Sequence, residues 1–159
     1  MSGMRILILY ESVTGNAKGM ARILQLFFER EGATVTVGQM QQTDAAVMAN
    51  YDAVIISTYT WLGGIVPPPV NDFYEDIPQV DLSKPVVVGV AGTGDPWYGK
   101  DYNTAPDLFD AAFEKAGAVV GAEPVKIEQG AEKSDMPAFA AFVKAIIAKV
   151  KDVQGHAKE

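Results

Sequence analysis

The sequence predicts a doubly wound α/β fold, in which a five-stranded parallel sheet of order 2-1-3-4-5 carries helices on both faces. Short runs that are apolar at nearly every position alternate along the chain with segments of helical apolar spacing, which is typical of buried parallel strands joined by helices. Three of the apolar runs lead into segments rich in glycine, hydroxyl and aromatic residues. In such sheets ligands bind outside the carboxyl ends of the strands, where the strand order reverses.

The strands are predicted from their apolar patterns. Residues 34–37 alternate between threonine and valine, as a short edge strand does, and the last strand is split by an interruption at Gly121–Pro124. Nearly continuous apolar runs indicate strands buried on both faces. The predicted strands other than the edge strand occupy residues 4–10, 53–56, 85–90, 118–120 and 125–127.

The helices are predicted from apolar residues that recur on one face and from residues that end a helix. Gly32 and Gly117 follow the last turns of two amphipathic segments and are natural C-terminal stops. Thr43 or Asp44 is the expected cap of a short helix, and Ser134 opens the last one. The predicted helices occupy residues 16–31, 43–50, 70–76, 105–116 and 134–150.

The composition predicts one globular domain and excludes several classes of function. The chain has 159 residues, of which 48% are hydrophobic, and we expect a single domain over residues 1–152 and a frayed polar tail at 153–159. A net charge of −7 disfavours nucleic acid and anionic membranes as partners. There is no cysteine, no signal-peptide pattern and no apolar stretch near ~20 residues, so we expect a cytoplasmic protein without thiolate metal sites.

The segment Tyr10–Gly19 has the chemistry of a phosphate cradle. It lies between an apolar run and a helical pattern, where free N–H groups and the helix dipole favour an anion. Ser12 and Thr14 offer hydroxyl donors, and Asn16 offers an amide. The segment contains neither a Walker A loop nor a dinucleotide turn, and taken alone it also fits an ordinary turn with a capping Ser or Thr.

Two further loops each offer aromatic side chains. Trp61 follows the run at 53–56, and Trp97 and Tyr98 follow the run at 85–90. Two aromatic rings across a crevice can hold a flat heterocycle between them, and the adjoining glycines let backbone groups approach its polar edge. One terminal phosphate and one large planar ring together describe flavin mononucleotide (FMN).

Three motifs in this order and spacing resemble those of the flavodoxin family, and the resemblance extends over most of the chain. The family's phosphate motif corresponds to Ser12-Val13-Thr14-Gly15-Asn16-Ala17, and its T-W-x-G segment corresponds to Thr60-Trp61-Leu62-Gly63. Its third motif corresponds to Gly92-Thr93-Gly94-Asp95-Pro96-Trp97-Tyr98. The split last strand has no room for the insertion of the long-chain subgroup, so the chain resembles a short-chain bacterial flavodoxin.

The resemblance implies a role for each of these residues. Ser12, Thr14 and Asn16 hold the FMN phosphate together with backbone N–H groups of residues 13–17, which include Val13, Gly15 and Ala17, and Thr58 or Thr60 adds a hydroxyl. Trp61 covers one flavin face and Tyr98 the other. Asp95 lies near the pyrimidine or ribityl side. Backbone groups of Leu62, Gly63, Thr93, Gly94 and Asp95 bond the polar edge of the ring, and Gly92 lets the backbone approach it. The Leu62–Gly63 peptide stabilises the one-electron-reduced flavin.

The implied function is low-potential transfer of single electrons between redox proteins, without catalysis of substrate turnover. The implied partners are a flavodoxin or ferredoxin reductase as donor and electron-accepting enzymes, which dock on a monomer through an acidic rim and the apolar loop 62–69. The alternative is an FMN-dependent NAD(P)H:quinone reductase on the same fold, but that needs an open flavin face. A receiver domain is disfavoured because Tyr10-Glu11 and Ser57-Thr58 stand where it needs acids.

The chain departs from the family pattern at three places. Ala17 stands where the family has Thr or Ser, which removes one phosphate hydroxyl. The loop 62–69 lacks the usual acids, so we expect a less negative potential for the second reduction than an acidic loop gives. Asp101-Tyr102 replaces the usual aromatic-Cys pair, and Trp97 therefore competes with Tyr98 as the stacking residue.

Overall fold

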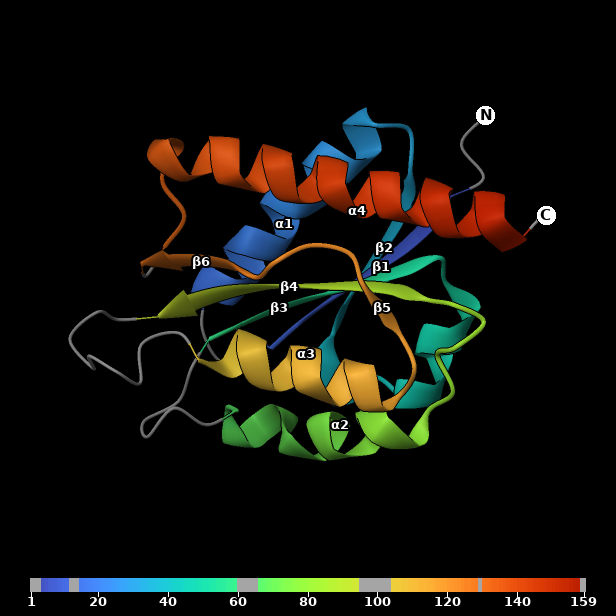
Figure 1. The fold of residues 1–159 in the computed structure, drawn as a ribbon. Coiled ribbons are helices and arrows are strands. Elements are labelled where there is room, and N and C mark those ends of the chain that lie inside the picture. The colour runs from blue at the N-terminus through green and yellow to red at the C-terminus, as the bar shows by residue number, and fades with distance from the viewer. Residues whose placement is uncertain (1–3, 12–14, 60–65, 95–103, 129, 158–159) are drawn as a thin grey trace.

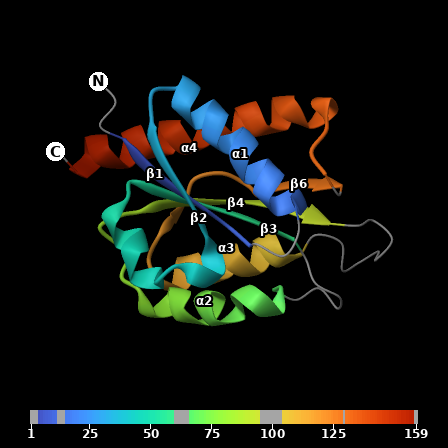
Figure 2. The ribbon, with the colours of Figure 1, turned by 180° about the vertical axis from the view of Figure 1, so that it is seen from behind.

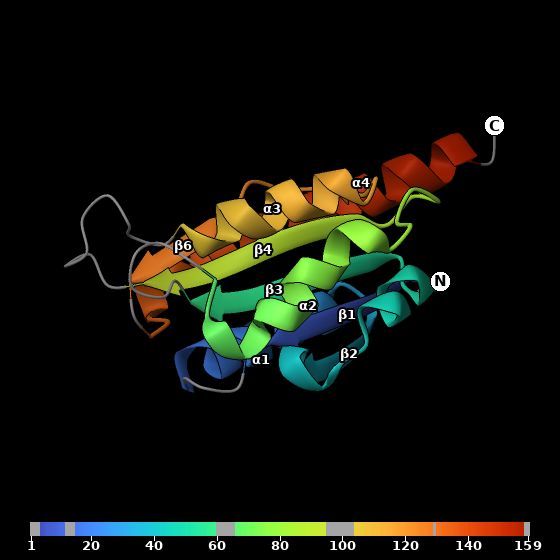
Figure 3. The same cartoon turned by 90° about the horizontal axis from the view of Figure 1, so that it is seen from below.

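A parallel sheet lies between two layers of helices in the computed structural model, which describes residues 4–11, 15–59, 66–94, 104–128 and 130–157 (Figure 1). Helices α1 and α4 cover one face of the sheet, and α2 and α3 cover the other (Figures 1 and 2). Figure 3 looks onto the α2–α3 layer. The strands are β1 (Arg5–Tyr10), β2 (Thr34–Gln39), β3 (Ala53–Tyr59), β4 (Val87–Gly94), β5 (Val119–Val120) and β6 (Val125–Glu128). The α-helices are α1 (Gly15–Arg30), α2 (Asn71–Asp76), α3 (Ala105–Lys115) and α4 (Met136–Ala157).

The strand order is β2-β1-β3-β4-β5, and every described pairing is parallel. This confirms the predicted doubly wound fold. The predicted split of the last strand is also confirmed, because β5 and β6 both pair with β4. Val119 and Val120 lie beside Val87 and Val88, whereas β6 lies beside residues 91–94. The chain leaves the ladder between them and rejoins it nearer the carboxyl edge.

The continuous apolar runs are explained by two cores, one on each face of the sheet. In β1, Leu7 and Leu9 belong to the core under α2 and α3, whereas Ile6 and Ile8 belong to the core under α1 and α4. A strand that is buried on both sides needs apolar residues at successive positions. Gly89 of β4 lets α4 come close, since a Cβ there would lie 2.7 Å from atoms of two α4 side chains.

Most predicted helix ends are found as expected. Gly32 and Gly117 have φ values of 92° and 85°, a conformation that favours glycine, and they follow α1 and α3. Of the two expected caps of the short helix, Asp44 is the one used, because its side chain accepts a 2.9 Å hydrogen bond from the backbone N–H of Ala46. That helix is a 3₁₀ segment over Ala45–Asn50.

The end of the last helix differs from the prediction. A frayed tail was expected from Val153, but α4 continues to Ala157 and Val153 packs against the core. The Gln154 side chain donates to Asp52 Oδ1 over 2.9 Å, and Asp52 Oδ2 accepts from the backbone N–H of Arg5 over 2.7 Å. The Gln154 side chain is therefore held at the amino ends of the strands, by a contact that a sequence pattern does not reveal.

Candidate functional site

The carboxyl ends of β1, β3 and β4 lie together at one end of the strands, which we call the carboxyl edge of the sheet (Figure 1). The strand register sets Tyr10 beside Ser57 and Tyr59 beside Thr93. Each of the three predicted loops therefore leaves from this carboxyl edge, as the predicted strand order requires. The reversal of strand order between β1 and β3 places a ligand site here.

Helix α1 starts at the carboxyl edge and presents its first turn there. Its first N–H groups, from Gly15 onward, have no partner within the helix. Asn16 is exposed, and no atom of the described residues lies within 4 Å of a Cβ built on Gly15. The helix start thus has open space and polar donors, which fits a phosphate group.

Ser57 attaches the start of α1 to the sheet. Its Oγ donates a buried hydrogen bond of 2.6 Å to the carbonyl of Ala17. Ala17 itself is fully buried, so a larger side chain there would have to enter packed space. The prediction did not include Ser57. In the sequence, Ser57 is marked only as the hydroxyl residue that directly follows the apolar run at 53–56.

Gly130 is a second residue that the sequence analysis did not include. It follows β6, and a Cβ at this position would lie 3.1 Å from Asn16 Oδ1. The segment between β6 and α4 therefore lies against the start of α1. Asn16 and Gly130 are 114 residues apart, so no local pattern could connect them.

The ends of β3 and β4 supply further predicted residues. Thr58 is fully buried, and its hydroxyl donates to the Tyr59 carbonyl over 3.2 Å. Gly92, Thr93 and Gly94 form the last three positions of β4, where Thr93 is buried and Gly94 is half-buried. Of the predicted backbone contributors of the third motif, Thr93 and Gly94 thus lie at the carboxyl edge, and Asp95 lies outside the described residues.

Glu11 is a buried acid at the end of β1. It is fully buried, and its backbone N–H donates to the Ser57 carbonyl over 3.3 Å. Burial raises the pKa of the nearby Tyr59 phenol, and the negative charge of Glu11 raises that pKa further. From the sequence, Glu11 bears only on the rejection of a receiver domain.

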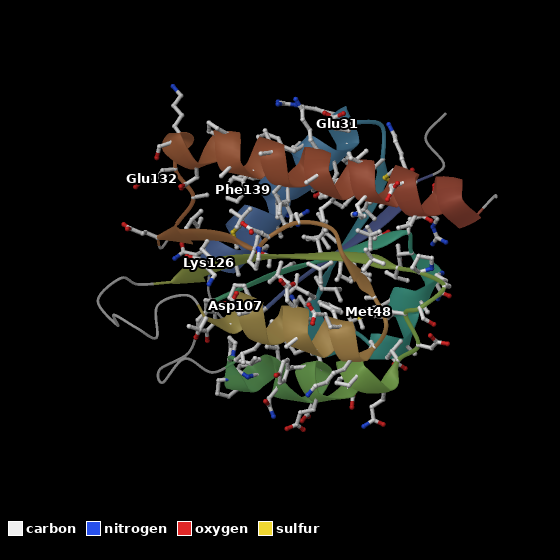
Figure 4. The ribbon with its side chains drawn as sticks, in the orientation of Figure 1. Glu31, Met48, Asp107, Lys126, Glu132 and Phe139 are labelled. Atoms are coloured by element: carbon white, nitrogen blue, oxygen red, sulfur yellow. The ribbon has the colours of Figure 1, made fainter. Side chains whose placement is uncertain are left out.

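A small charged cluster joins the start of α3 to β6. Lys126 Nζ lies 2.6 Å from Asp107 Oδ2, and Figure 4 labels both residues. Asp110, one turn along α3, has a half-buried carboxyl whose Oδ1 is buried without a partner among the described residues. Burial raises the pKa of Asp110 to about 6, Asp107 and Glu114 raise it further, and Lys126 opposes them.

Several predicted site residues lie outside the described part of the chain, so their positions stay predictions. Among the described residues, no group of three or more acids, histidines or cysteines could hold a metal ion, and no helix is long and apolar enough to cross a membrane. The predicted residues outside the described ranges are Ser12, Val13, Thr14, Thr60, Trp61, Leu62, Gly63, Asp95, Trp97 and Tyr98.

The doubly wound fold and the open start of α1 at the strand-order reversal define the class of protein: a doubly wound α/β protein with a candidate ligand site at the carboxyl ends of its strands. Comparison with known proteins narrows this class. The model of the flavodoxin family matches residues 8–142. "Probable flavodoxin 1" of Bacillus subtilis (strain 168) is 32% identical over 145 residues, which cover 91% of this chain and 90% of that protein.

Solved structures agree with the family match. A short-chain flavodoxin associated with a bacterial microcompartment has a TM-score of 0.88 at 35% identity, covering 92% of this chain and 99% of that one. A flavodoxin of Streptococcus pneumonia TIGR4 has a TM-score of 0.86 at 33% identity, covering 91% and 99%. The chain belongs to the flavodoxin family. It is an FMN-binding electron-transfer protein.

Proposed function

We propose that this chain holds the FMN phosphate at the start of α1 and the flavin ring between the loops that follow β3 and β4. The observation that carries the proposal is the open, polar start of α1 at the carboxyl edge. The first N–H groups of the helix and the Asn16 amide face that edge as donors, and the helix dipole favours the negative phosphate. Ser12, Thr14 and the backbone of residues 13–17 complete this phosphate site.

Contacts from two other elements support the position of the phosphate site. The Ser57–Ala17 hydrogen bond attaches the first turn of α1 to β3, and Gly130 lies against Asn16. Of the two threonines expected to add a hydroxyl, we favour Thr60, since the Thr58 hydroxyl already donates to the Tyr59 carbonyl. The site is thus preorganised from β3, α1 and the segment after β6.

The flavin ring is proposed to lie between Trp61 and Tyr98, with Trp97 as the competing stacking residue. Backbone groups of residues 92–95 and 62–63 bond its polar edge. Bound FMN supplies the redox chemistry, and the protein sets its potential through nearby charge and burial. The net charge of −7 disfavours additional negative charge on the ring, which lowers the potential.

The proposed partners are a flavodoxin or ferredoxin reductase as electron donor and electron-accepting enzymes. Docking through an acidic rim and the apolar loop 62–69 would give weak, salt-sensitive complexes. The start of α3 contributes Asp107 to that rim, and its side chain is 56% exposed despite its ion pair. We further propose a monomeric cytoplasmic carrier without substrate turnover of its own.

A reductive titration tests this function. The FMN-loaded protein is reduced stepwise under anaerobic conditions while visible absorbance is followed. We expect two separate one-electron steps, and we expect NADH to reduce the protein only when a reductase is added. Reduction in a single two-electron step, or rapid quinone reduction by NADH without a reductase, would favour the quinone reductase instead.

A further inference from the structure

Strand β2 is an outer strand whose open side lacks the usual protection against pairing with another chain. Among the described residues it pairs with β1 alone. Outer strands commonly carry charges, prolines or interruptions that prevent such pairing. On the opposite side of the sheet, β5 has only two residues, Pro124 lies in the interruption, and β6 carries Lys126. Residues 34–43 contain no charged residue and no proline, so β2 is open to a further strand.

The backbone groups on the open side of β2 follow from its bonds to β1. The N–H of Thr34 donates to the Met4 carbonyl over 3.0 Å, so Thr34 faces β1. Backbone groups alternate between the two sides of a strand, and Val35 and Val37 therefore face outward. Each of these two valines offers one N–H and one C=O that have no partner among the described residues.

A second copy of β2 fits this open side in antiparallel orientation. When Thr36 lies opposite Thr36 of the second copy, Val35 pairs with Val37 of that copy and Val37 with its Val35. Each of these pairs exchanges two bonds, so all the open valine groups are used, and the two exposed threonine side chains face each other. The register that pairs Val35 with Gln39 is less suitable, because the Gln39 carbonyl already accepts from Thr43 Oγ1 over 2.7 Å.

Helix α1 packs on β1 and β2 and carries a polar flank on the side of β2 (Figure 2). Phe27 lies on the other flank, where it lines a groove against α4. Helix α4 packs on β4 and β6, so the flank of α1 that turns away from α4 lies toward β2. Gln25 is about 160° around the helix from Phe27 and belongs to that flank. The flank is a row of four polar side chains: Lys18, Arg22, Gln25 and Glu29.

The polar flank of α1 favours the same two-fold arrangement as β2. The helix runs antiparallel to β2, and its middle lies beside the middle of the strand. In the arrangement centred on Thr36, the two copies of α1 therefore run antiparallel to each other. Lys18 then lies opposite Glu29 of the second copy, and Arg22 lies opposite its Gln25, so opposite charges meet on both sides of the axis.

The charge distribution makes a second copy a suitable occupant of this surface. Two chains of net charge −7 repel each other where acidic surfaces meet. The layer of α2 and α3 exposes acids such as Asp72, Glu75 and Glu114. The open side of β2 is uncharged, and the polar flank of α1 carries both signs, so repulsion between copies is weak here.

We infer that two copies of the chain associate reversibly through β2 and the polar flank of α1, which joins their sheets into one. The inference goes beyond the proposed function and does not depend on the FMN site. The carboxyl edges of the two copies point in opposite directions, so both stay open to ligand and partner. A contact of one short strand and one helix flank is weak, and the proposed monomer is the form present at low concentration.

Sedimentation equilibrium of the FMN-loaded protein from about 1 µM to about 1 mM tests the inference. We expect the average mass of the wild type to rise from 17.0 kDa toward twice that value. Thr36→Lys sets two ammonium groups against each other at the axis and should stay at 17.0 kDa throughout. Gln79→Lys is the matched control, because it adds the same charge at an exposed position after α2 and should associate like the wild type.

A charge reversal tests the contribution of α1 separately. Lys18→Glu sets like charges against each other in both copies and should raise the dissociation constant about tenfold. The double variant Lys18→Glu/Glu29→Lys restores opposite charges and should associate like the wild type. If Thr36→Lys does not fold, these two variants decide the question alone.

Three results would overturn the inference. A wild-type mass that stays at 17.0 kDa up to about 1 mM would mean that the copies do not associate. Association that persists in Thr36→Lys would mean that another surface is used. A double variant that associates no better than Lys18→Glu would mean that the α1 flanks do not meet.

Discussion

Polar side chains are buried at the carboxyl ends of the strands (the carboxyl edge) and exposed at their amino ends (the amino edge). At the carboxyl edge, Glu11, Ser57, Thr58 and Thr93 are all buried, and they are the only buried polar or charged residues in the described part of the chain. At the amino edge, polar contacts are exposed, as in the bonds of Asp52 to Arg5 and Gln154. Burying a polar group requires a compensating partner. The buried polar side chains are thus concentrated at the carboxyl ends of the strands, where ligands bind in doubly wound sheets.

The largest expected effect that distinguishes the edges comes from Ser57→Ala. It removes the buried hydrogen bond from Ser57 Oγ to the Ala17 carbonyl, which is expected to lower the free energy of unfolding by ~0.5–1.5 kcal/mol. FMN affinity should fall as well, since the first turn of α1 loses its attachment to β3. Urea unfolding and flavin titration measure the two effects. A loss of stability without any loss of FMN affinity would separate Ser57 from the site.

Asn16→Ala is expected to act on the ligand and not on the fold. Asn16 is exposed, so the free energy of unfolding should change little. Loss of one donor to a charged phosphate should weaken FMN about tenfold. Riboflavin affinity serves as the control and should stay constant. An equal loss for both ligands would place Asn16 away from the phosphate.

Asp110→Asn tests whether the charged cluster at the start of α3 affects stability. The pKa of Asp110 is raised to about 6, so the folded state holds this proton more tightly than the unfolded chain does. The resulting stabilisation is fully present below about pH 4 and is lost as the pH rises through about 6. Removal of the carboxylate should therefore stabilise the apoprotein at pH 7 by ~1 kcal/mol, a small value because the group is partly exposed. Unfolding curves from pH 4 to 8 check this, and an unchanged pH slope in Asp110→Asn would contradict it.

The smallest effect is expected at the amino edge. Gln154→Ala removes one exposed hydrogen bond to Asp52 and should lower the free energy of unfolding by ~0.5 kcal/mol. FMN affinity should be identical to that of the wild type, because the contact lies at the opposite edge. Thermal unfolding and flavin titration provide the comparison. Weaker FMN binding in this variant would mean that the two edges are coupled.

The fold could be predicted from the sequence because each strand carries its own signal. Continuous apolar runs such as residues 4–10 reflect burial on both faces, and Gly32 and Gly117 mark helix ends through their backbone conformation. The end of α4 was missed, because it is held by the packing of Val153 on the core and by the bond of Gln154 to the distant Asp52. The spacing of apolar residues along the sequence indicates which residues are buried. It carries no information about a hydrogen bond between residues that are far apart in the sequence.

The candidate site was predictable only in part. The motif at residues 12–17 marks the start of α1, and the structure places its last three residues at the carboxyl edge. Ser57, Gly130 and Glu11 were not predicted, since their relation to the site arises from strand pairing and loop packing. A serine that ends an apolar strand is compatible with many roles. Its partner becomes evident only when β3 and α1 are placed side by side.

The most direct test of the central claim compares backbone amide chemical shifts in the presence of FMN and of riboflavin. The shift difference between the two ligands isolates the phosphate, because the ring is common to both. We expect the largest differences at the amides of residues 15–17 and smaller ones at Gly130, with none at Asp52 or Gln154. Equal shifts with both ligands at residues 15–17, or differences confined to the amino edge, would contradict a phosphate site at the start of α1.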